Sequence, residues 1–115
     1  MEIERDQSNG CAILRVQGEI VLEVLHQLKH EFHRCITDEE YYVALNLEHV
    51  TALSSSGVGA IMGFSRELNE LGGQLILASV APVAEYVIEL LRLRELFTLA
   101  ASEAEAIDLL NASRG

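Results

Sequence analysis

Three consecutive serines, Ser54, Ser55 and Ser56, stand at the start of a stretch with helical periodicity, and Gly57 and Gly59 follow them. A helix N-terminus exposes unpaired backbone N–H groups and a partial positive charge, so a serine there caps the helix well. A phosphate at this place is held better still, because it accepts several of those N–H bonds. The pattern predicts a capped helix, and it favours phosphorylation as a chemistry for the cluster, although capping alone already explains one of the serines.

Catalysis by these serines would need a base beside the nucleophile. His49, on the segment before the serines, is the one nearby candidate in the sequence. Residues 55–59, Ser-Ser-Gly-Val-Gly, form neither a Gly-x-Ser-x-Gly elbow nor a phosphate-binding loop with Gly-Lys-Ser/Thr. We therefore expect no enzymatic activity. A nucleotide-binding or hydrolytic protein is the alternative from another class.

Two further groups of side chains have chemical potential. His26, His30 and His33 fall on one side of a predicted helix, and three histidines can ligate zinc. No residue in the sequence suggests a fourth ligand, so we expect a polar helix flank, no metal and no cofactor. Cys11 and Cys35 form no Cys-x-x-Cys pair and lie on apolar faces, which predicts buried, reduced and unreactive thiols.

The elements that position the serines follow from the spacing of apolar residues. Asn9-Gly10 is typical of a tight turn between two antiparallel strands, and Gly18 is expected to end the second strand. Gly72-Gly73 is expected to close the helix after the serines, since glycine accepts the left-handed backbone found there. The predicted elements are strands at 3–7 and 11–17, a helix from about 22 to 36, a strand at 42–47, a loop, the helix after the serines, a strand at 74–80, a helix starting near Pro82, a weak strand at 96–99 and a final helix with Ser102 and Glu105 as a capping box.

Each predicted helix carries an apolar stripe. The residues expected to face the core are Leu25, Leu28, Phe32 and Cys35 in the first helix, Val58, Ile61, Met62 and Leu68 in the second, Val83, Val87, Leu90 and Leu91 in the third, and Ile107 and Leu110 in the last. The order β-β-α-β-α-β-α-β-α predicts an α/β fold with a mostly parallel mixed sheet of about five strands and four helices, in which the first hairpin is antiparallel.

Length and charge limit the function. The chain has 115 residues, half of them hydrophobic, which suits one domain spanning residues 1–115. A net charge of −10 disfavours binding to nucleic acid and to anionic membranes, and it suits a partner with a basic docking face. The sequence contains neither a signal-peptide core nor an apolar run that would insert into a membrane, so we expect a cytoplasmic protein.

Residues 46–59, Asn-Leu-Glu-His-Val-Thr-Ala-Leu-Ser-Ser-Ser-Gly-Val-Gly, resemble the signature of the STAS domain, the fold of bacterial anti-sigma-factor antagonists. The family pattern there is an apolar strand ending in Asp-Leu, a loop with Val, and Asp-Ser-Ser-Gly-Leu-Gly. Residues 16–20, Val-Gln-Gly-Glu-Ile, are similar to the family segment Gly-Glu-Leu/Ile-Asp at the end of the second strand. The order of elements agrees over essentially the whole chain.

The resemblance implies a partner-switching regulator of transcription. Such a protein binds an anti-sigma factor that is also a serine kinase, is released when phosphorylated, and is reset by a serine phosphatase. By register with Gly57, the resemblance places the acceptor at Ser55, with Ser54 and Ser56 as second choices. The partner-binding residues that it suggests are Leu53, Ser54, Ser55, Ser56, Gly57, Val58, Gly59 and Met62.

The sequence departs from the family pattern at two positions. Ser54 stands where the family has Asp before the acceptor, and Val21 stands where Asp follows Gly-Glu-Ile. Both changes remove carboxylates from the surroundings of the acceptor. The alternative that this protein binds its partner without being phosphorylated therefore remains. The alternative within the same fold is an accessory subunit of a transporter or of a lipid-trafficking ATPase.

Overall fold

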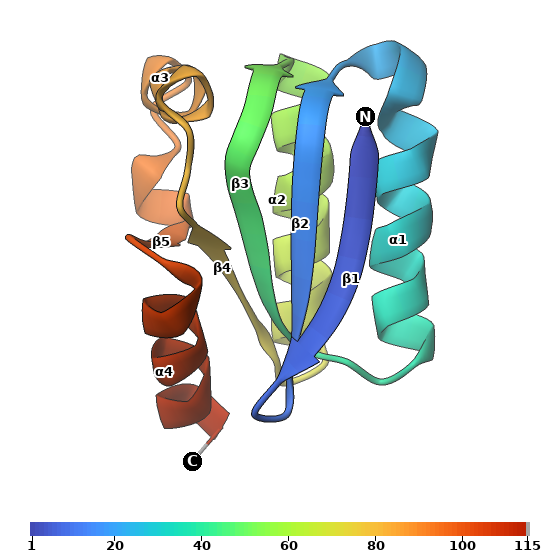
Figure 1. The fold of residues 1–115 in the computed structure, drawn as a ribbon, viewed down its shortest axis with the longest axis vertical. Coiled ribbons are helices and arrows are strands. Elements are labelled where there is room, and N and C mark those ends of the chain that lie inside the picture. The colour runs from blue at the N-terminus through green and yellow to red at the C-terminus, as the bar shows by residue number, and fades with distance from the viewer. Residues whose placement is uncertain (115) are drawn as a thin grey trace.

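A computed structural model describes residues 1–114 of the chain (Figure 1). Within these residues, no helix is both long enough and apolar enough to span a bilayer. The elements are β1 (Glu2–Ser8), β2 (Cys11–Ile20), the 3-10 helix η1 (Leu22–Val24), α1 (Leu25–Thr37), β3 (Tyr42–Leu53), α2 (Ser55–Glu70), β4 (Gln74–Ala78), α3 (Pro82–Leu90), the 3-10 helix η2 (Arg94–Leu96), β5 (Thr98–Ala100) and α4 (Glu103–Arg114).

The strands form one five-stranded sheet in the order β1-β2-β3-β4-β5. β1 is antiparallel to β2, and the other neighbouring pairs are parallel. The predicted α/β fold, with a mostly parallel mixed sheet and four α-helices, is therefore confirmed within residues 1–114. Parallel strands end at the same edge of a sheet. The last residues of β2 and β3 therefore lie at one end of the molecule, where α2 also begins (Figure 1).

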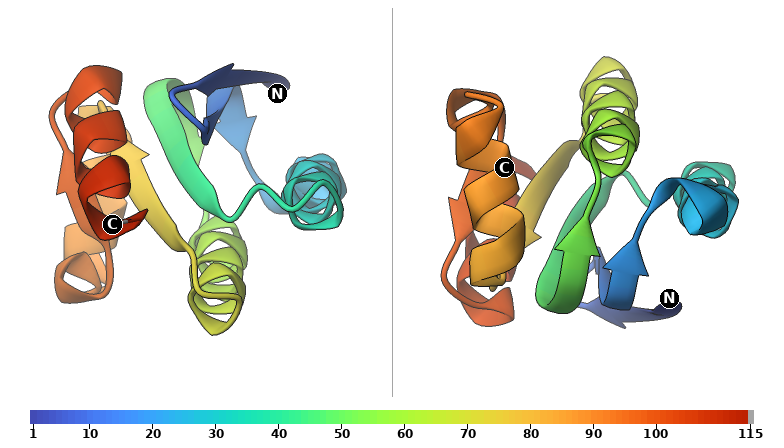
Figure 2. Two further views of the ribbon diagram at one scale, coloured as in Figure 1. Left: turned by 90° about the horizontal axis from the view of Figure 1, so that it is seen from below. Right: turned by 90° about the horizontal axis from the view of Figure 1, so that it is seen from above.

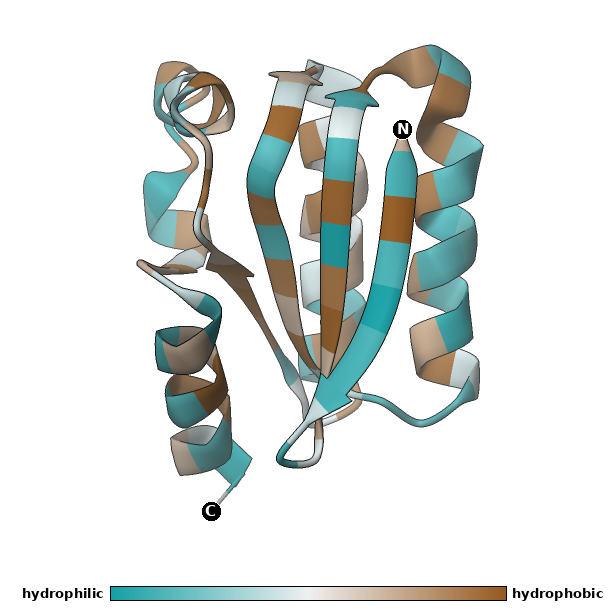
Figure 3. Ribbon diagram, in the orientation of Figure 1, coloured by the Kyte–Doolittle hydropathy of each residue, from teal (hydrophilic) through white to brown (hydrophobic). Residues whose placement is uncertain are grey.

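The two faces of the sheet are covered differently (Figure 2). α1 and α2 cover one face, where the rings of Phe32 and Phe64 stack with their centroids 4.0 Å apart. α4 packs against β3 and β4 on the other face and buries Ala106 and Leu110 there. β1 is mostly hydrophilic along its length (Figure 3). Its Glu4 lies on the rest of that face, where it pairs with Arg15 of β2. A polar, uncovered part of the sheet therefore adjoins the start of α4.

Three predicted helix ends are confirmed. α2 ends with Gly72 at a φ of +83°, where the Gly72 N–H donates to the Asn69 carbonyl and the Gly73 N–H donates to the Leu68 carbonyl. This pair of bonds satisfies carbonyls that would otherwise be left without partners at the helix end. Pro82 occupies the first turn of α3. The Ser102 hydroxyl caps α4, while the carboxylate of its predicted capping partner accepts from the Ala101 N–H.

Two strands run longer than the sequence pattern predicts. Gly18 does not end β2; the strand continues to Ile20 with Gly18 at a φ of +96°, a backbone region that favours glycine. Residues 48–53, expected as a loop, instead extend β3 to Leu53. The pairing of β2 with β3 shifts register at two places, one of them directly after Gly18, and such irregularities interrupt the period-two pattern of a regular strand. At the C-terminal side, η2 takes up residues 94–96, so β5 covers Thr98–Ala100 rather than 96–99.

The apolar stripe expected for α3 is mostly wrong. The helix buries Ala84 and Ile88, and of the four expected residues Val87 alone packs against the core. The other three are exposed: Val83, Leu90 and Leu91. Apolar residues recur at helical spacing on two sides of α3. The spacing alone therefore cannot show which of the two sides is buried against the sheet.

Candidate functional site

The predicted serine cap of α2 is present, and the N-cap residue is Ser54. Its backbone is extended, with φ −81° and ψ 161°, and its hydroxyl accepts the Gly57 N–H at 3.0 Å. The Ser54 carbonyl accepts the Val58 N–H at 3.0 Å, which is the first turn of the helix. The hydroxyls of Ser54 and Ser56 lie 2.9 Å apart and share a hydrogen bond. Two of the three serines are therefore engaged in building the start of the helix.

Ser55 differs from both neighbours. It is exposed, whereas Ser54 and Ser56 are half-buried, and its hydroxyl makes no hydrogen bond within residues 1–114. It is the first residue of α2, where the backbone N–H groups have no intrahelical partners. The exposed hydroxyl thus lies beside unpaired N–H donors at the positive end of a 16-residue helix.

Close packing holds the serine segment in place. The Ser54 N–H donates to the Ile20 carbonyl at 2.9 Å, which joins the end of β2 to the start of α2. A Cβ at Gly57 would lie 2.7 Å from Ile20 Cγ2 and 3.1 Å from Leu53 Cδ1. No side chain larger than glycine fits there without movement of its neighbours, so Gly57 sets how closely α2 approaches β2.

The residues suggested for partner binding divide into two groups. The side chains of Leu53 and Val58 are buried, at 6% and 1% exposure, and belong to the core beneath the start of α2. Met62 is half-buried and packs against that core, and Gly59 is exposed. The surface that a partner can reach here therefore consists of Ser55, Gly59 and the polar edges of the other serines. Leu53 and Val58 support this surface from the core and are not exposed on it.

The carboxylates that the family pattern places near the acceptor have no substitutes in the described hydrogen-bond network. The serine hydroxyls bond to each other and to the backbone, and no Asp or Glu bonds to them within residues 1–114. Val21 is half-buried and precedes η1. Within residues 1–114, the hydrogen bonds of the serine segment thus run among the serines and to backbone groups rather than to acidic side chains.

The other reactive residues lie apart from the serines. His49 belongs to β3, pairs with Gln17 and makes no hydrogen bond with the serines in the part of the chain that is described. His26, His30 and His33 are exposed on α1. Among residues 1–114, no group of three or more His, Cys, Asp or Glu side chains is placed to hold a metal ion.

Both cysteines are free and buried, as predicted. Burial raises the pKa of the Cys35 thiol to about 11, with Arg5 partly opposing that rise. A thiol with such a pKa is almost entirely protonated near neutral pH, so Cys35 is a poor nucleophile.

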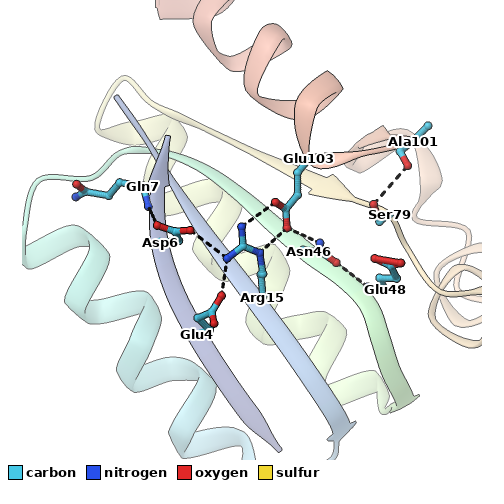
Figure 4. A network of polar contacts seen from close by, with 9 residues as sticks. All are labelled: Glu4, Asp6, Gln7, Arg15, Asn46, Glu48, Ser79, Ala101 and Glu103. Atoms are coloured by element: carbon cyan, nitrogen blue, oxygen red, sulfur yellow. Dashed lines mark hydrogen bonds and ion pairs between the residues drawn. The ribbon is translucent and has the colours of Figure 1, made fainter. Parts of the chain in front are cut away.

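A second polar cluster, which the sequence pattern did not reveal, surrounds Arg15 on the open face of the sheet (Figure 4). Arg15 Nε lies 2.7 Å from Glu103 Oε2, and a second guanidinium nitrogen lies 2.9 Å from Glu103 Oε1. Asp6, at 3.2 Å, and Glu4 also pair with Arg15. The hydrogen bonds of Arg15, followed by that of the Asn46 amide, lower the pKa of Glu103, although partial burial opposes this.

This cluster fastens α4 to the sheet. Asn46, a buried polar residue of β3, donates to Glu103 Oε2 at 2.6 Å and accepts the Glu48 N–H at 2.8 Å. A cavity of about 780 Å³ opens above the network. Because carboxylates already neutralise Arg15, the cavity offers no free cation to an anionic ligand. No local sequence signal identifies the cluster, since its members come from four separate elements.

Known proteins of similar sequence and structure share the fold described above. The Anti-sigma F factor antagonist of Paenibacillus polymyxa is 22% identical over 108 residues, which cover 93% of this chain and 92% of the relative. The solved structure of the anti-sigma factor antagonist SpoIIAA in its unphosphorylated form superposes with a TM-score of 0.80 at 25% identity, covering 96% of this chain and 97% of that one. The Bacillus SpoIIAA structure in the phosphorylated form has a TM-score of 0.71 at 25% identity and covers 94% and 98%. Residues 2–106 match the STAS domain as a family, and the chain belongs to that family.

Proposed function

We propose that this protein is an anti-sigma-factor antagonist, which binds an anti-sigma factor through the surface at the start of α2 and is released when Ser55 is phosphorylated. The observation that carries the proposal is the difference among the three serines. Ser54 and Ser56 bond to each other and Ser54 caps α2, whereas the Ser55 hydroxyl is exposed and unbonded within residues 1–114. A kinase can reach Ser55 without first breaking the helix cap.

The position of Ser55 explains how a phosphate would act. A phosphate there adds about −1.5 to −2 charges at neutral pH. The N–H groups in the first turn of α2 would hold it close to the helix, because they favour an anion at that end. The same surface would then present a charge and additional bulk to a partner that had docked on a neutral serine. This supports a switch in which phosphorylation weakens binding.

The comparisons support the proposal by analogy. A relative that covers most of the chain is named an anti-sigma F factor antagonist, and SpoIIAA, with the same fold, has been solved in both unphosphorylated and phosphorylated forms. By this analogy the partner is an anti-sigma factor. The family resemblance of the sequence further implies that this partner also acts as a serine kinase and that a serine phosphatase restores the unphosphorylated form. The protein itself would be a cytoplasmic binding module rather than an enzyme.

The first test maps the modified residue. The purified protein is incubated with ATP and its cognate anti-sigma factor kinase, and phosphopeptides are mapped by mass spectrometry for the wild type and for Ser54→Ala, Ser55→Ala and Ser56→Ala. We expect loss of phosphate in Ser55→Ala alone. Modification only outside residues 54–56 would contradict the proposal.

The second test measures binding to the same anti-sigma factor by calorimetry. Ser55→Ala should bind like the wild type, and Ser55→Asp should bind at least about tenfold more weakly if the added charge opposes docking. Ser113→Asp, at an exposed position of α4, is the matched control for adding one negative charge. Equal affinities of Ser55→Asp and Ser55→Ala would refute the switch.

A further inference from the structure

A groove of about 640 Å³ runs between α1 and α2 and begins at the serine segment, because Ser56 is among the residues that line it. The stacked pair Phe32 and Phe64 lies at its floor, and both side chains are buried, at 5% and 3% exposure. Leu22, at the start of the 3-10 helix η1 before α1, also lines the groove and is 67% exposed, so its side chain is available to a partner. The groove is thus open, with buried apolar residues at its floor and charged residues on its rim, and it is continuous with the surface around Ser55.

Glycines on α2 keep the groove open. Gly59 and Gly63 lie one turn apart inside the helix and both line the groove. Neither has a positive φ, and a Cβ built on either would have no heavy atom within 4 Å outside the adjoining backbone. Gly57, in contrast, is required by close contact with Ile20. Glycine is among the poorest helix formers, so the packing of this chain gives no reason for glycine at positions 59 and 63.

The rim of the groove carries a free positive charge. Lys29 and His33 of α1 line it on one side, and Glu67 of α2 lines it on the other. Lys29 takes part in none of the ion pairs found within residues 1–114. In a chain with a net charge of −10, an unpaired lysine beside this groove favours an occupant with a carboxylate at that point.

We infer that this groove receives an amphipathic helix of the anti-sigma factor, with the apolar side of that helix against Leu22 and the surface opened by Gly59 and Gly63, and with a carboxylate facing Lys29. The inference rests on the proposed function, because the groove continues the surface around Ser55 and the same partner then covers both. Glycines at i and i+4 remove a row of side chains from α2, which lets a second helix approach closely along that row. A phosphate on Ser55 adds charge and bulk at the end of the groove that Ser56 lines.

The test fills the groove without disturbing the fold. Gly63→Leu places a side chain in the open space, and Gly63→Ala leaves most of that space free. Asn69→Leu introduces the same side chain at an exposed position of the same helix outside the groove. The readouts are the urea midpoint of each variant and its Kd for the purified cognate anti-sigma factor. We expect Gly63→Leu to keep the wild-type urea midpoint or exceed it, and to raise the Kd about tenfold or more, whereas Gly63→Ala and Asn69→Leu bind like the wild type.

Charge reversal tests the second half of the inference. Lys29→Glu should raise the Kd by at least about threefold, and the effect should shrink at high salt. Arg66→Glu reverses another exposed cation, on α2 and outside the groove lining, and should change the Kd less.

The outcomes separate the groove from the proposed function. If the wild type binds the anti-sigma factor and Ser55→Asp weakens the complex, but the folded Gly63→Leu variant binds like the wild type, the groove inference is overturned and the proposed function stands. If the wild type does not bind the anti-sigma factor, both are overturned. If Gly63→Leu loses stability, methyl and amide NMR shifts of the wild type on adding the anti-sigma factor decide: changes at Leu22, Lys29 and Gly63 support the groove, and changes confined to residues 54–59 refute it.

Discussion

Replacing Gly57 with alanine is the most direct test of how the serine segment is held. The added Cβ would lie 2.7 Å from Ile20 Cγ2, 3.1 Å from Leu53 Cδ1 and 3.3 Å from the Ile20 carbonyl oxygen. The nearest atom belongs to a β-branched side chain with little freedom, and the carbonyl belongs to the backbone. The clash is therefore relieved only when α2 moves away from the end of β2.

The expected change in the free energy of unfolding combines two opposing effects. Overpacking of this kind destabilises a protein by about 1–3 kcal/mol. Alanine is the better helix former by up to about 1 kcal/mol, with less gain in the first turn. We expect a net loss of about 1–2 kcal/mol in the free energy of unfolding, and a fall in Tm of about 4–8 °C for a domain of this size.

Gly59→Ala is the matched control, because it changes a glycine two positions along the same helix where a Cβ meets nothing within 4 Å. It should leave the free energy of unfolding unchanged or raise it by about 0.5–1 kcal/mol. Urea unfolding followed by circular dichroism measures both variants under the same conditions. A Gly57→Ala midpoint at or above that of Gly59→Ala would refute the close-packing argument.

Three other changes have expected outcomes. Ser54→Ala removes the N-cap of α2 and should lower the free energy of unfolding by about 1 kcal/mol, whereas Ser55→Ala should change it by less than about 0.5 kcal/mol; equal urea midpoints would contradict the cap assignment. The pKa of Glu103 is lowered in the folded state by its ion pair, so its stabilisation is present above pH 4.5 and is lost as the pH falls through the folded value. Glu103→Gln should therefore lower stability at pH 7 by about 0.5–1 kcal/mol and flatten its decline between pH 5 and pH 3 in urea titrations, and an unchanged decline would argue against the ion pair. Ile88→Ala should cost about 2–4 kcal/mol and Leu90→Ala less than about 0.5 kcal/mol in the same assay, and the reverse order would contradict the orientation of α3.

The order and type of the elements could be predicted because each carries a local signal. Asn9-Gly10 forms the turn of the first hairpin. The two glycines after α2 end that helix, because their N–H groups bond to carbonyls of its last turn. Pro82 and Ser102 marked the starts of the last two helices. Such signals act within a few residues, so the sequence reveals them without knowledge of the tertiary structure.

The errors come from features that depend on distant partners. Residues 48–53 belong to a strand only because the end of β2 pairs with them across two register shifts. α3 has apolar residues on two sides, and the side that faces inward is decided by where the helix docks on the sheet. Neither the extension of β3 nor the orientation of α3 can be recognised from the spacing of apolar residues in the sequence.

For the site, the sequence by itself determined that a serine segment with glycines caps a helix, and that the helix follows a buried strand. Only the tertiary structure decided which serine is free, because the Ser54 N–H bonds to the Ile20 carbonyl at the end of β2, and this distant contact fixes Ser54 as the residue that caps the helix. It also decided that Leu53 and Val58 support the surface from the core instead of forming part of it. The physical reason is that spacing along a chain fixes which local bonds can form, whereas burial depends on which elements pack together.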